Sequence, residues 1–599
     1  MRFPAGLRRH WAFAGLLLLG AALRGVVLVA YHPALIFPDS VRYLQYAHNF
    51  TTGHWSPDAL RQSGYSVAII PVVLLHALWL LPLLQHLAGL ATAGLVYAVL
   101  IRSGARPWLA AVAAVPVLFD PLQLVLEQYV LTDVGAALLI MAALVILVWR
   151  REGPRTREAA AAGLLLGVAV TFRDQDLIMI VPAALYLLVK IRPARMLLIR
   201  LGTTAGCFLI PVVGYLGWFA SAHGQWNFTT FDGAFLYGRV ADFADCRGLA
   251  LPGYEQPLCP AEPPAQRNAD FYTWNPRSPQ WTFTPPAGRS RDAVVRDFSL
   301  RILRHQPLSY AEAVGRDLLY GFSPVRGAGP EQYSPAYLQF GTSVRPDRAA
   351  YASIAKLGYP PPSVEYGPAA FLTGYGRWVY LPGPALAAGL VLALAGLVAS
   401  RFRDRDTLLF TASAIAILLP PAMFATFDWR YQLPQLSLIP VAAVLGLQAM
   451  GSHAIVSRRS AGIQADTPVL PCDGHPAASV SPCARPGGRA RRGGRARRGT
   501  RGGRGGMAPR SFSLDFWSFA RGRPGAAAPG GSGVPAGAPV HRLGQVPGGA
   551  GRDRAAGVPG AAAAARPGRR VRAGGGRAAP VRAGDGGGPV RGAAAPRCL

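Results

Sequence analysis

Residues 11–31 read WAFAGLLLLGAALRGVVLVAY, and the polar segment FPDSVRYL follows at residues 37–44. The first stretch is long enough to cross a bilayer as a helix, because about 20 apolar residues match a hydrocarbon core of roughly 30 Å. Three arginines precede it within the first ten residues, and this positive charge predicts a cytoplasmic N-terminus. Asp39 is therefore expected just beyond the outer membrane surface, at the start of an outer loop.

The composition is that of a polytopic membrane protein. Of the 599 residues, 51% are hydrophobic and 15% are charged, which is too apolar for a soluble protein of this length. The formal net charge of +31 would suggest a nucleic-acid binder, but 25 Arg and only 5 Asp lie from Ser452 onward. A cleavable signal peptide in the first 30 residues is an alternative, although no small-residue cleavage site follows the long apolar stretch.

About ten apolar segments are predicted to cross the membrane. They cover approximately residues 11–31, 80–101, 108–119, 130–149, 159–172, 177–189, 196–219, 381–400, 408–426 and 433–450. With this count, the four short basic connections between them all fall on the cytoplasmic side. The stretch 65–79 is instead predicted to lie in or dip into the outer interface, broken at Pro71.

These segments divide the chain into four parts. Residues 1–219 form an N-terminal transmembrane module that includes the first outer loop, 32–79; residues 220–380 form an extracytoplasmic loop domain; residues 381–451 form C-terminal transmembrane helices; and residues 452–599 form a tail. The predicted fold is an all-α polytopic protein of the cell membrane, with both termini cytoplasmic and a loop large enough to be a domain.

The tail is predicted to be disordered. From Asp466 it contains no Lys, Glu, Asn, Ile or Tyr and consists mainly of Ala, Gly, Pro, Arg and Val, so it cannot bury enough apolar surface to fold. Arg-Gly runs such as 498–506 raise nucleic-acid binding as an alternative, but few aromatic residues accompany them, and nucleic acid is not expected as a partner. Our interpretation is an out-of-frame extension of a GC-rich gene.

Cys246 and Cys259 both lie in the predicted outer loop. An exported compartment permits disulfides, so we expect the two to be paired, with two free cysteines as the alternative. No CxxC spacing is present, and such a bridge would be structural.

Ionisable residues recur where the predicted spans reach the outer face. They are Asp39, Glu127, Asp133, Arg173, Arg430 and, within the first span, Arg24. Each has a structural alternative, namely helix capping, a local ion pair or an interfacial anchor. Together they converge on one face, where carboxylates and arginines at the headgroup level suit a substrate that carries a phosphate and a hydroxyl.

The order of four motifs is more specific than any one of them. They are P-D-S-x-x-Y-L at 38–44, R-Q-S-G-Y at 61–65, L-E-x-x-x-L-x-D at 126–133 and D-W-R-Y-Q-L-P at 428–434. In this order the chain resembles the polyprenyl-phosphate-dependent membrane glycosyltransferases of the GT-C fold. The segments LYGRVADFADC at 236–246 and LCP at 258–260 are similar to the outer loop of the actinobacterial subgroup.

The resemblance implies that a sugar leaves a polyprenyl phosphate at the outer face and joins a hydroxyl of a glycan, lipid or protein. Asp39 matches the family's first-loop acid and would be the general base, and Glu127 or Asp133 matches a second acidic position. The donor phosphate would be bound by Arg61, Arg173 and Arg430. The chain has one acid where the common pattern has a pair, so no cofactor is certain and a divalent cation stays open.

A lipid or solute transporter is the competing interpretation of the spans. Transporters more often show discontinuous helices within inverted repeats, and we see no repeat between the halves of the chain.

Overall fold

The computed structural model describes residues 10–327, 335–344 and 347–465, with only the backbone at 335–336 and 452–465. The predictions for the N-terminal arginines and for the tail after residue 465 fall outside this range. Within it, the chain is helical apart from two short strands, β1 (Tyr31–His32) and β2 (Ser363–Val364), which pair antiparallel.

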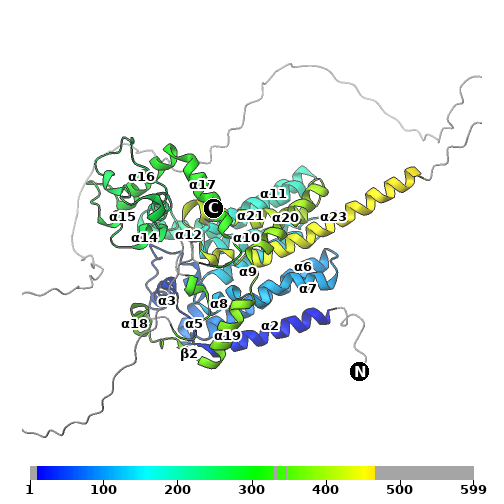
Figure 1. Cartoon of the computed structure of the whole chain (residues 1–599), viewed down its shortest axis with the longest axis horizontal. Coiled ribbons are helices and arrows are strands. Elements are labelled where there is room, and N and C mark those ends of the chain that lie inside the picture. Colours follow the sequence, from blue (N-terminus) through cyan, green and yellow to red (C-terminus); the bar gives the residue numbers. More distant parts are fainter. Residues whose placement is uncertain (1–9, 328–334, 345–346, 466–599) are drawn as a thin grey trace, which may run out of the picture. The chain divides into compact units, whose positions relative to one another are not determined.

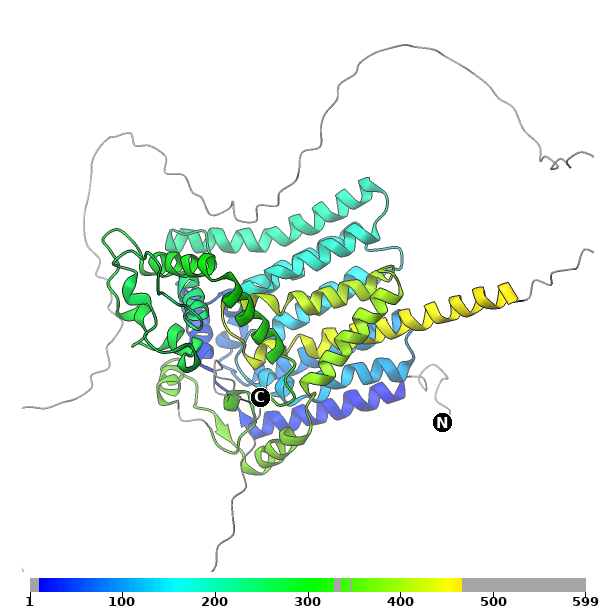
Figure 2. The ribbon, with the colours of Figure 1, turned by 45° about the horizontal axis from the view of Figure 1, so that its top comes forward.

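Each of the ten predicted apolar segments forms a helix, and Figures 1 and 2 show these helices side by side in a bundle. They are α2 (Trp11–Ala30), α6 (Leu80–Arg102), α7 (Pro107–Phe119), α9 (Asp133–Val148), α10 (Thr156–Phe172), α11 (Ile180–Lys190), α12 (Ala194–His223), α20 (Gly383–Ala399), α21 (Arg405–Ala416) and α23 (Gln435–Ala465). The last helix continues past residue 451, where the tail was expected to begin.

Fewer than ten of these helices meet the requirements of a full crossing. Five helical segments in the described part of the chain are long and apolar enough to span a membrane, or up to seven if each of two bent helix pairs counts as one span. Helices α9, α10 and α11 have 16, 17 and 11 residues, fewer than the roughly 20 that a straight crossing needs. The chain is a multi-pass membrane protein, and the number ten remains a prediction.

Proline explains where several helices break. α7 and α8 (Pro121–Gln128) meet at an angle of 47° because Asp120, which precedes Pro121, is extended instead of helical. The stretch 65–79 likewise forms two short helices, α4 (Gly64–Ala68) and α5 (Ile70–Leu74), with Pro71 in the first turn of α5. Neither is long enough to cross, as predicted for this stretch.

Small residues allow α10 and α12 to pack closely. Gly163 and Gly167 form a G-x-x-x-G pair on α10. A Cβ atom at Gly163 would lie 2.2 Å from the carbonyl oxygen of Thr204 on α12, and one at Gly167 would lie 2.3 Å from that of Phe208. Such close backbone contact is typical of helix pairs within membranes.

The connections at one end of the bundle form a separate layer of short helices (Figure 2). The first outer loop contributes α3 (Pro38–Thr51), α4 and α5. The long loop contributes α13 (Asp232–Ala241), α14 (Ala269–Trp274), α15 (Pro279–Thr282), α16 (Arg291–His305), α17 (Pro307–Tyr320), α18 (Arg348–Lys356) and α19 (Tyr366–Trp378). The long loop has its own hydrophobic cluster, as expected for a domain. Its members include Tyr237, Val294 and Phe298.

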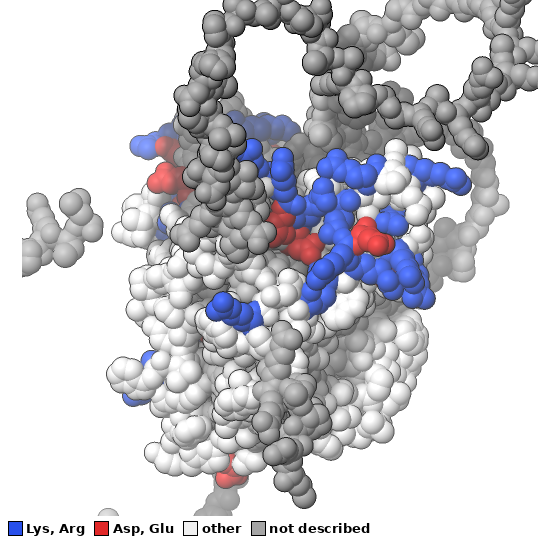
Figure 3. Space-filling model, turned by 90° about the vertical axis from the view of Figure 1, so that its right-hand side faces the viewer, with Lys and Arg blue, Asp and Glu red and all other residues white. Residues whose placement is uncertain are grey.

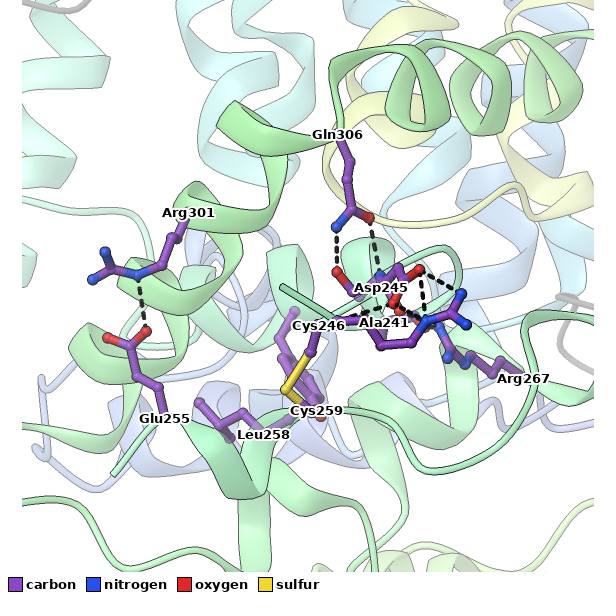
Figure 4. Close-up of a disulfide and its surroundings, with 12 residues drawn as sticks. Ala241, Asp245, Cys246, Glu255, Leu258, Cys259, Arg267, Arg301 and Gln306 are labelled. Carbon is purple, nitrogen blue, oxygen red and sulfur yellow. Dashed lines mark hydrogen bonds and ion pairs between the residues drawn. A yellow bond between two sulfur atoms is a disulfide. The ribbon is translucent and has the colours of Figure 1, made fainter. Parts of the chain in front are cut away.

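Cys246 and Cys259 form a disulfide in this domain, with an S–S distance of 2.15 Å (Figure 4). Neighbouring contacts hold the same loop: Arg267 Nη1 donates to the carbonyl oxygens of Ala241 and Ala244, at 3.0 and 2.8 Å. The bridge therefore joins a segment that follows α13 to the turn before α14.

We expect that replacing both cysteines, Cys246→Ser with Cys259→Ser, lowers the free energy of unfolding of the loop domain by about 3 kcal/mol, because the bridge closes a short loop in the unfolded chain. Peptide mapping of unreduced protein would identify the linked pair, and chemical unfolding would measure the loss. Cys207→Ser, at the free cysteine of α12, is the matched control. Free thiols at both positions in exported protein would contradict the expectation.

Candidate active site

Helix α3 carries Asp39 in its first turn, but Asp39 does not cap the helix. Ser40 Oγ accepts from the backbone N–H of Phe37 at 2.9 Å and donates to the carbonyl oxygen of Val130 at 2.8 Å. Ser40 therefore both closes the turn and ties it to the segment before α9. The Asp39 carboxylate is left to make other contacts, which argues against the capping alternative.

Two arginines from distant parts of the chain hold the Asp39 carboxylate. Arg61 donates to Oδ1 from Nε and Nη2, at 3.0 and 2.8 Å, and Arg430 Nη1 donates to Oδ2 at 3.1 Å. Only 7% of Asp39 is exposed. Burial raises the pKa of Asp39, but the charges of Arg61 and Arg430 outweigh it and lower the pKa to about 2. Asp39 is an anion at neutral pH.

Aromatic rings fix both guanidinium groups. Arg61 Cζ lies 4.9 Å from the ring centre of Trp274 on α14, and Arg430 Cζ lies 5.3 Å from that of Phe37 and 5.4 Å from that of Tyr431. The loop domain thus contributes to the site through Trp274. The sequence did not single out Trp274, because one aromatic residue in a long polar loop gives no local signal.

Arg173 forms its ion pair with Asp133, on a different helix. Nη1 of Arg173 donates to Asp133 Oδ1 at 2.8 Å, and Arg173 Cζ lies 5.3 Å from the ring centre of Tyr431. This pair therefore lies beside Arg430 across the Tyr431 ring. Asp133 Oδ2 is buried without a hydrogen-bond partner.

Two further acids lie near this cluster and carry raised pKa values. Burial raises the pKa of Asp176, in the 3-10 helix η1 (Asp174–Met179), to about 7, despite the opposing charge of Arg173. Burial and the nearby Asp428 raise the pKa of Asp270 on α14 to about 7. One oxygen of each carboxylate, Oδ2, is buried without a partner. Sequence reasoning did not select Asp270, which nothing local distinguishes from other acids of the loop.

Glu127, predicted as an alternative to Asp133, lies in a different cluster inside the bundle. It is fully buried; Oε1 accepts from Arg24 Nη2 and Gln123 Nε2, each at 2.8 Å, and Oε2 lies 2.6 Å from His86 Nδ1. Arg24 is engaged there as well, since it also donates to the carbonyl oxygen of Leu118. Glu127 and Arg24 are therefore paired with each other inside the bundle, whereas Asp133 lies with Arg173 beside the Tyr431 ring that Arg430 also contacts.

A buried ion pair of the loop domain holds the segment that leads to Arg430. Asp317 Oδ2 accepts from Arg239 Nη1 at 2.6 Å and from the backbone N–H of Phe427 at 2.9 Å. Asp428 then accepts from the backbone N–H of Arg430 at 3.1 Å. These contacts fix the turn from which Arg430 reaches Asp39.

The donor set at Asp39 does not fit a divalent cation. Its carboxylate faces two guanidinium groups, which repel a metal ion. Across the described residues, no group of three or more His, Cys, Asp or Glu is placed to hold one. We derive no step through a metal.

Solved structures of several membrane transferases resemble parts of the chain at low identity. The Saccharomyces cerevisiae protein O-mannosyltransferase Pmt1-Pmt2 complex bound to its sugar donor aligns with 16% identity and a TM-score of 0.32, over 42% of this chain and 38% of that one. ArnT from Cupriavidus metallidurans aligns with 15% identity and a TM-score of 0.31, over 76% and 82%. The Archaeoglobus fulgidus oligosaccharyltransferase aligns with 13% identity and a TM-score of 0.35, over 78% and 53%.

A family model gives the more informative match. The chain spans well under half of the yeast protein above, and a search of curated protein sequences finds no match. The model described as dolichyl-phosphate-mannose-protein mannosyltransferase, however, matches residues 73–227, which include Asp133 and Arg173. The match covers about a quarter of the 599 residues, and over that region the chain is similar to this family.

Proposed function

We propose that the protein transfers a sugar from a polyprenyl-phosphate carrier to an acceptor hydroxyl at the outer face of the cell membrane, with Asp39 as general base. The observation that carries this proposal is the buried Asp39 carboxylate between Arg61 and Arg430. A carboxylate and two fixed cations at one point provide a proton acceptor beside a binding site for a phosphate.

In the proposed reaction the acceptor oxygen forms a bond to the anomeric carbon as its proton moves to Asp39. The bond between that carbon and the phosphate oxygen breaks, and its electron pair remains on the carrier phosphate. Arg61, Arg430 and Arg173 lie together at the Asp39 cluster and would stabilise this charge, because preorganised cations are an effective way to do so.

Donor binding would also prepare the base. In the unliganded protein the two arginines lower the pKa of Asp39 to about 2, which makes the carboxylate a weak base. A phosphate that takes over hydrogen bonds from Arg61 and Arg430 would reduce their hold on Asp39. Burial, which acts in the opposite direction, would remain, so the pKa of Asp39 would rise when the donor is present.

We also propose a topology for the chain: it crosses the membrane ten times, both termini are cytoplasmic, and the active site is extracytoplasmic. We further propose that the protein belongs to the actinobacterial subgroup. The acceptor is a glycan, lipid or protein. The arrangement of the helices supports this topology, because α9 begins and α10 ends at the Asp39 cluster, whereas their other ends meet at the basic connection 150–157.

The two bent helix pairs, α7 with α8 and α19 with α20, do not favour a transporter. Both breaks meet at the Asp120 carboxylate, which accepts from the backbone N–H of Leu122 at the first break and of Leu381 at the second, at 2.9 and 2.8 Å. Arg326 donates to both oxygens of Asp120, at 2.6 and 2.9 Å. The polar groups freed by the breaks are therefore satisfied within the protein, and no substrate or ion is needed to satisfy them.

Asp39→Asn should lower the transfer rate by roughly 10²- to 10⁴-fold, because the amide keeps the size of the side chain but cannot take the proton. The measurement is transfer of labelled sugar from polyprenyl phosphate by purified membranes. Asp58→Asn is the matched control, since Asp58 is a buried acid of the same outer loop that pairs with Arg42. Near-normal turnover of Asp39→Asn would remove Asp39 as the base.

Arg430→Lys should weaken donor use, because lysine keeps the charge but loses the planar fork that can bind a phosphate with two hydrogen bonds. If Arg430 were only an interfacial anchor, lysine could reach the headgroups equally well and the kinetics would not change. Rates measured as a function of donor concentration separate the two cases. The control is Arg377→Lys, at an arginine of α19 for which no ion pair is seen among the described residues.

Deletion of the residues after Ser460 should leave transfer activity intact, because every residue assigned to the site lies before it. The same membrane assay, with expression measured for both forms, provides the comparison. Loss of activity in a well-inserted truncated protein would instead favour a function that depends on the arginine-rich tail.

A further inference from the structure

A second polar site lies at the end of the bundle opposite the Asp39 cluster. It is a cavity of about 710 Å³ where four connections and the α23 helix meet, those of α6 to α7, α9 to α10, α11 to α12 and α20 to α21. α6 alone has 23 residues, a length of about 35 Å, and its first turn lies near the outer layer while Arg102 at its other end lines the cavity. The cavity is therefore distinct from the proposed active site.

The cavity is strongly basic. Figure 3 shows Lys and Arg side chains gathered around a few acidic groups on this end of the molecule. The cations that line the cavity are Arg102, Arg151, Lys190, Arg401 and Arg403. Against these five stand two carboxylates, Asp404 and Asp406, which leaves an excess of three positive charges.

Asp406 forms ion pairs with two of the cations. It accepts from Arg102 Nη1 at 2.8 Å and from Lys190 Nζ at 3.4 Å, and so joins two connections at the base of the cavity. Asp404 instead caps α21, where it accepts from the backbone N–H of Thr407. The three remaining cations of the lining have no ion pair among the described residues, and they point to an anion that is supplied from outside the chain.

The backbone that carries Arg401 and Arg403 is strained. Arg401 and Phe402 both have positive φ angles, 51° and 58°, in a region that residues other than glycine seldom adopt. Three backbone hydrogen bonds back to α20 hold this turn, among them Phe402 N–H to the carbonyl oxygen of Leu397 at 2.7 Å. The turn presents Arg401 and Arg403, both exposed, at the rim of the cavity.

We propose that this cavity binds a phosphate-bearing anion, the headgroup of an anionic membrane lipid or a free phosphate. Basic pockets between the ends of membrane helices suit such headgroups. Arginines without ion pairs can bind phosphate oxygens through two parallel hydrogen bonds. Leu445 and Ala449 of α23 also line the cavity, so its wall is apolar on the side of the bundle, as the start of a lipid chain requires.

The plainer explanation is that these residues only add to the positive charge that orients membrane proteins. That explanation predicts no difference between cations inside and outside the cavity. Arg192, on the connection between α11 and α12, and Arg195, in the first turn of α12, allow this comparison, because both are exposed and neither lines the cavity.

The test measures binding to full-length protein purified in an uncharged detergent. The probes are short-chain phosphatidylglycerol, short-chain phosphatidylcholine and inorganic phosphate, and binding is followed by titration and by the shift in Tm. The cavity variant is Arg401→Asn with Arg403→Ala, because asparagine tolerates a positive φ. Arg151→Ala, on another connection, is an independent variant, and Arg192→Ala with Arg195→Ala is the matched control.

We expect saturable binding of phosphatidylglycerol but not of phosphatidylcholine, weakened about tenfold or more by the cavity double variant and less by Arg151→Ala. Saturable binding of inorganic phosphate with the same pattern would support the site and identify a free phosphate as its ligand. Equal losses in the control variant would overturn the proposal in favour of general surface charge. Absence of saturable binding of either anion would overturn it as well. Neither result depends on transfer activity, so failure here leaves the proposed function unaffected.

Discussion

The Asp39 carboxylate, held between Arg61 and Arg430, is the interaction on which the outer half of the molecule depends. Arg430 lies 391 residues from Asp39 in the chain, so this ion pair joins the first outer loop to the turn before the last helix. Burying these charges is costly unless each is paired, and the aromatic rings that flank both arginines favour one arrangement of the three groups. Binding geometry and fold are therefore set by the same contacts.

Two other buried carboxylates also join segments that are distant in the chain. Asp120 joins both helix breaks, and Asp317 fixes the backbone before Arg430. In each case one buried acid accepts from an arginine and from a backbone N–H of a distant segment. Irregular backbone near a membrane needs such partners, because unpaired N–H groups are costly where water is scarce. The loop domain is thus attached to the helices through polar contacts at points where the helices break.

The sequence predicted the parts of this structure that depend on local pattern. Ten apolar stretches form helices, and Pro71 lies where the stretch 65–79 divides into two short helices, because hydrophobic runs and prolines act on their own neighbourhoods. It also predicted that Asp39, Glu127, Asp133, Arg173, Arg430 and Arg24 converge on the outer face, and the resemblance added Arg61. The sequence did not predict which of these residues form ion pairs. Arg173 forms one with Asp133 instead of the adjacent Asp174, and Glu127 forms one with Arg24 inside the bundle. Those choices depend on how helices separated in the chain pack, which no local pattern encodes.

The balance of charge around Asp39 explains how a buried cluster can be both stable and receptive. Arg61, Arg173 and Arg430 face the paired carboxylates Asp39 and Asp133. Asp428 also forms an ion pair with Arg430, and burial raises its pKa, as it raises the pKa of the nearby Asp176 and Asp270 to about 7. These acids take up a proton more readily than in water, and their protonation would offset the one negative charge that a phosphodiester brings. The same burial that makes unpaired charge costly in the empty site would then favour the bound anion, since its interaction with the arginines is weakly screened.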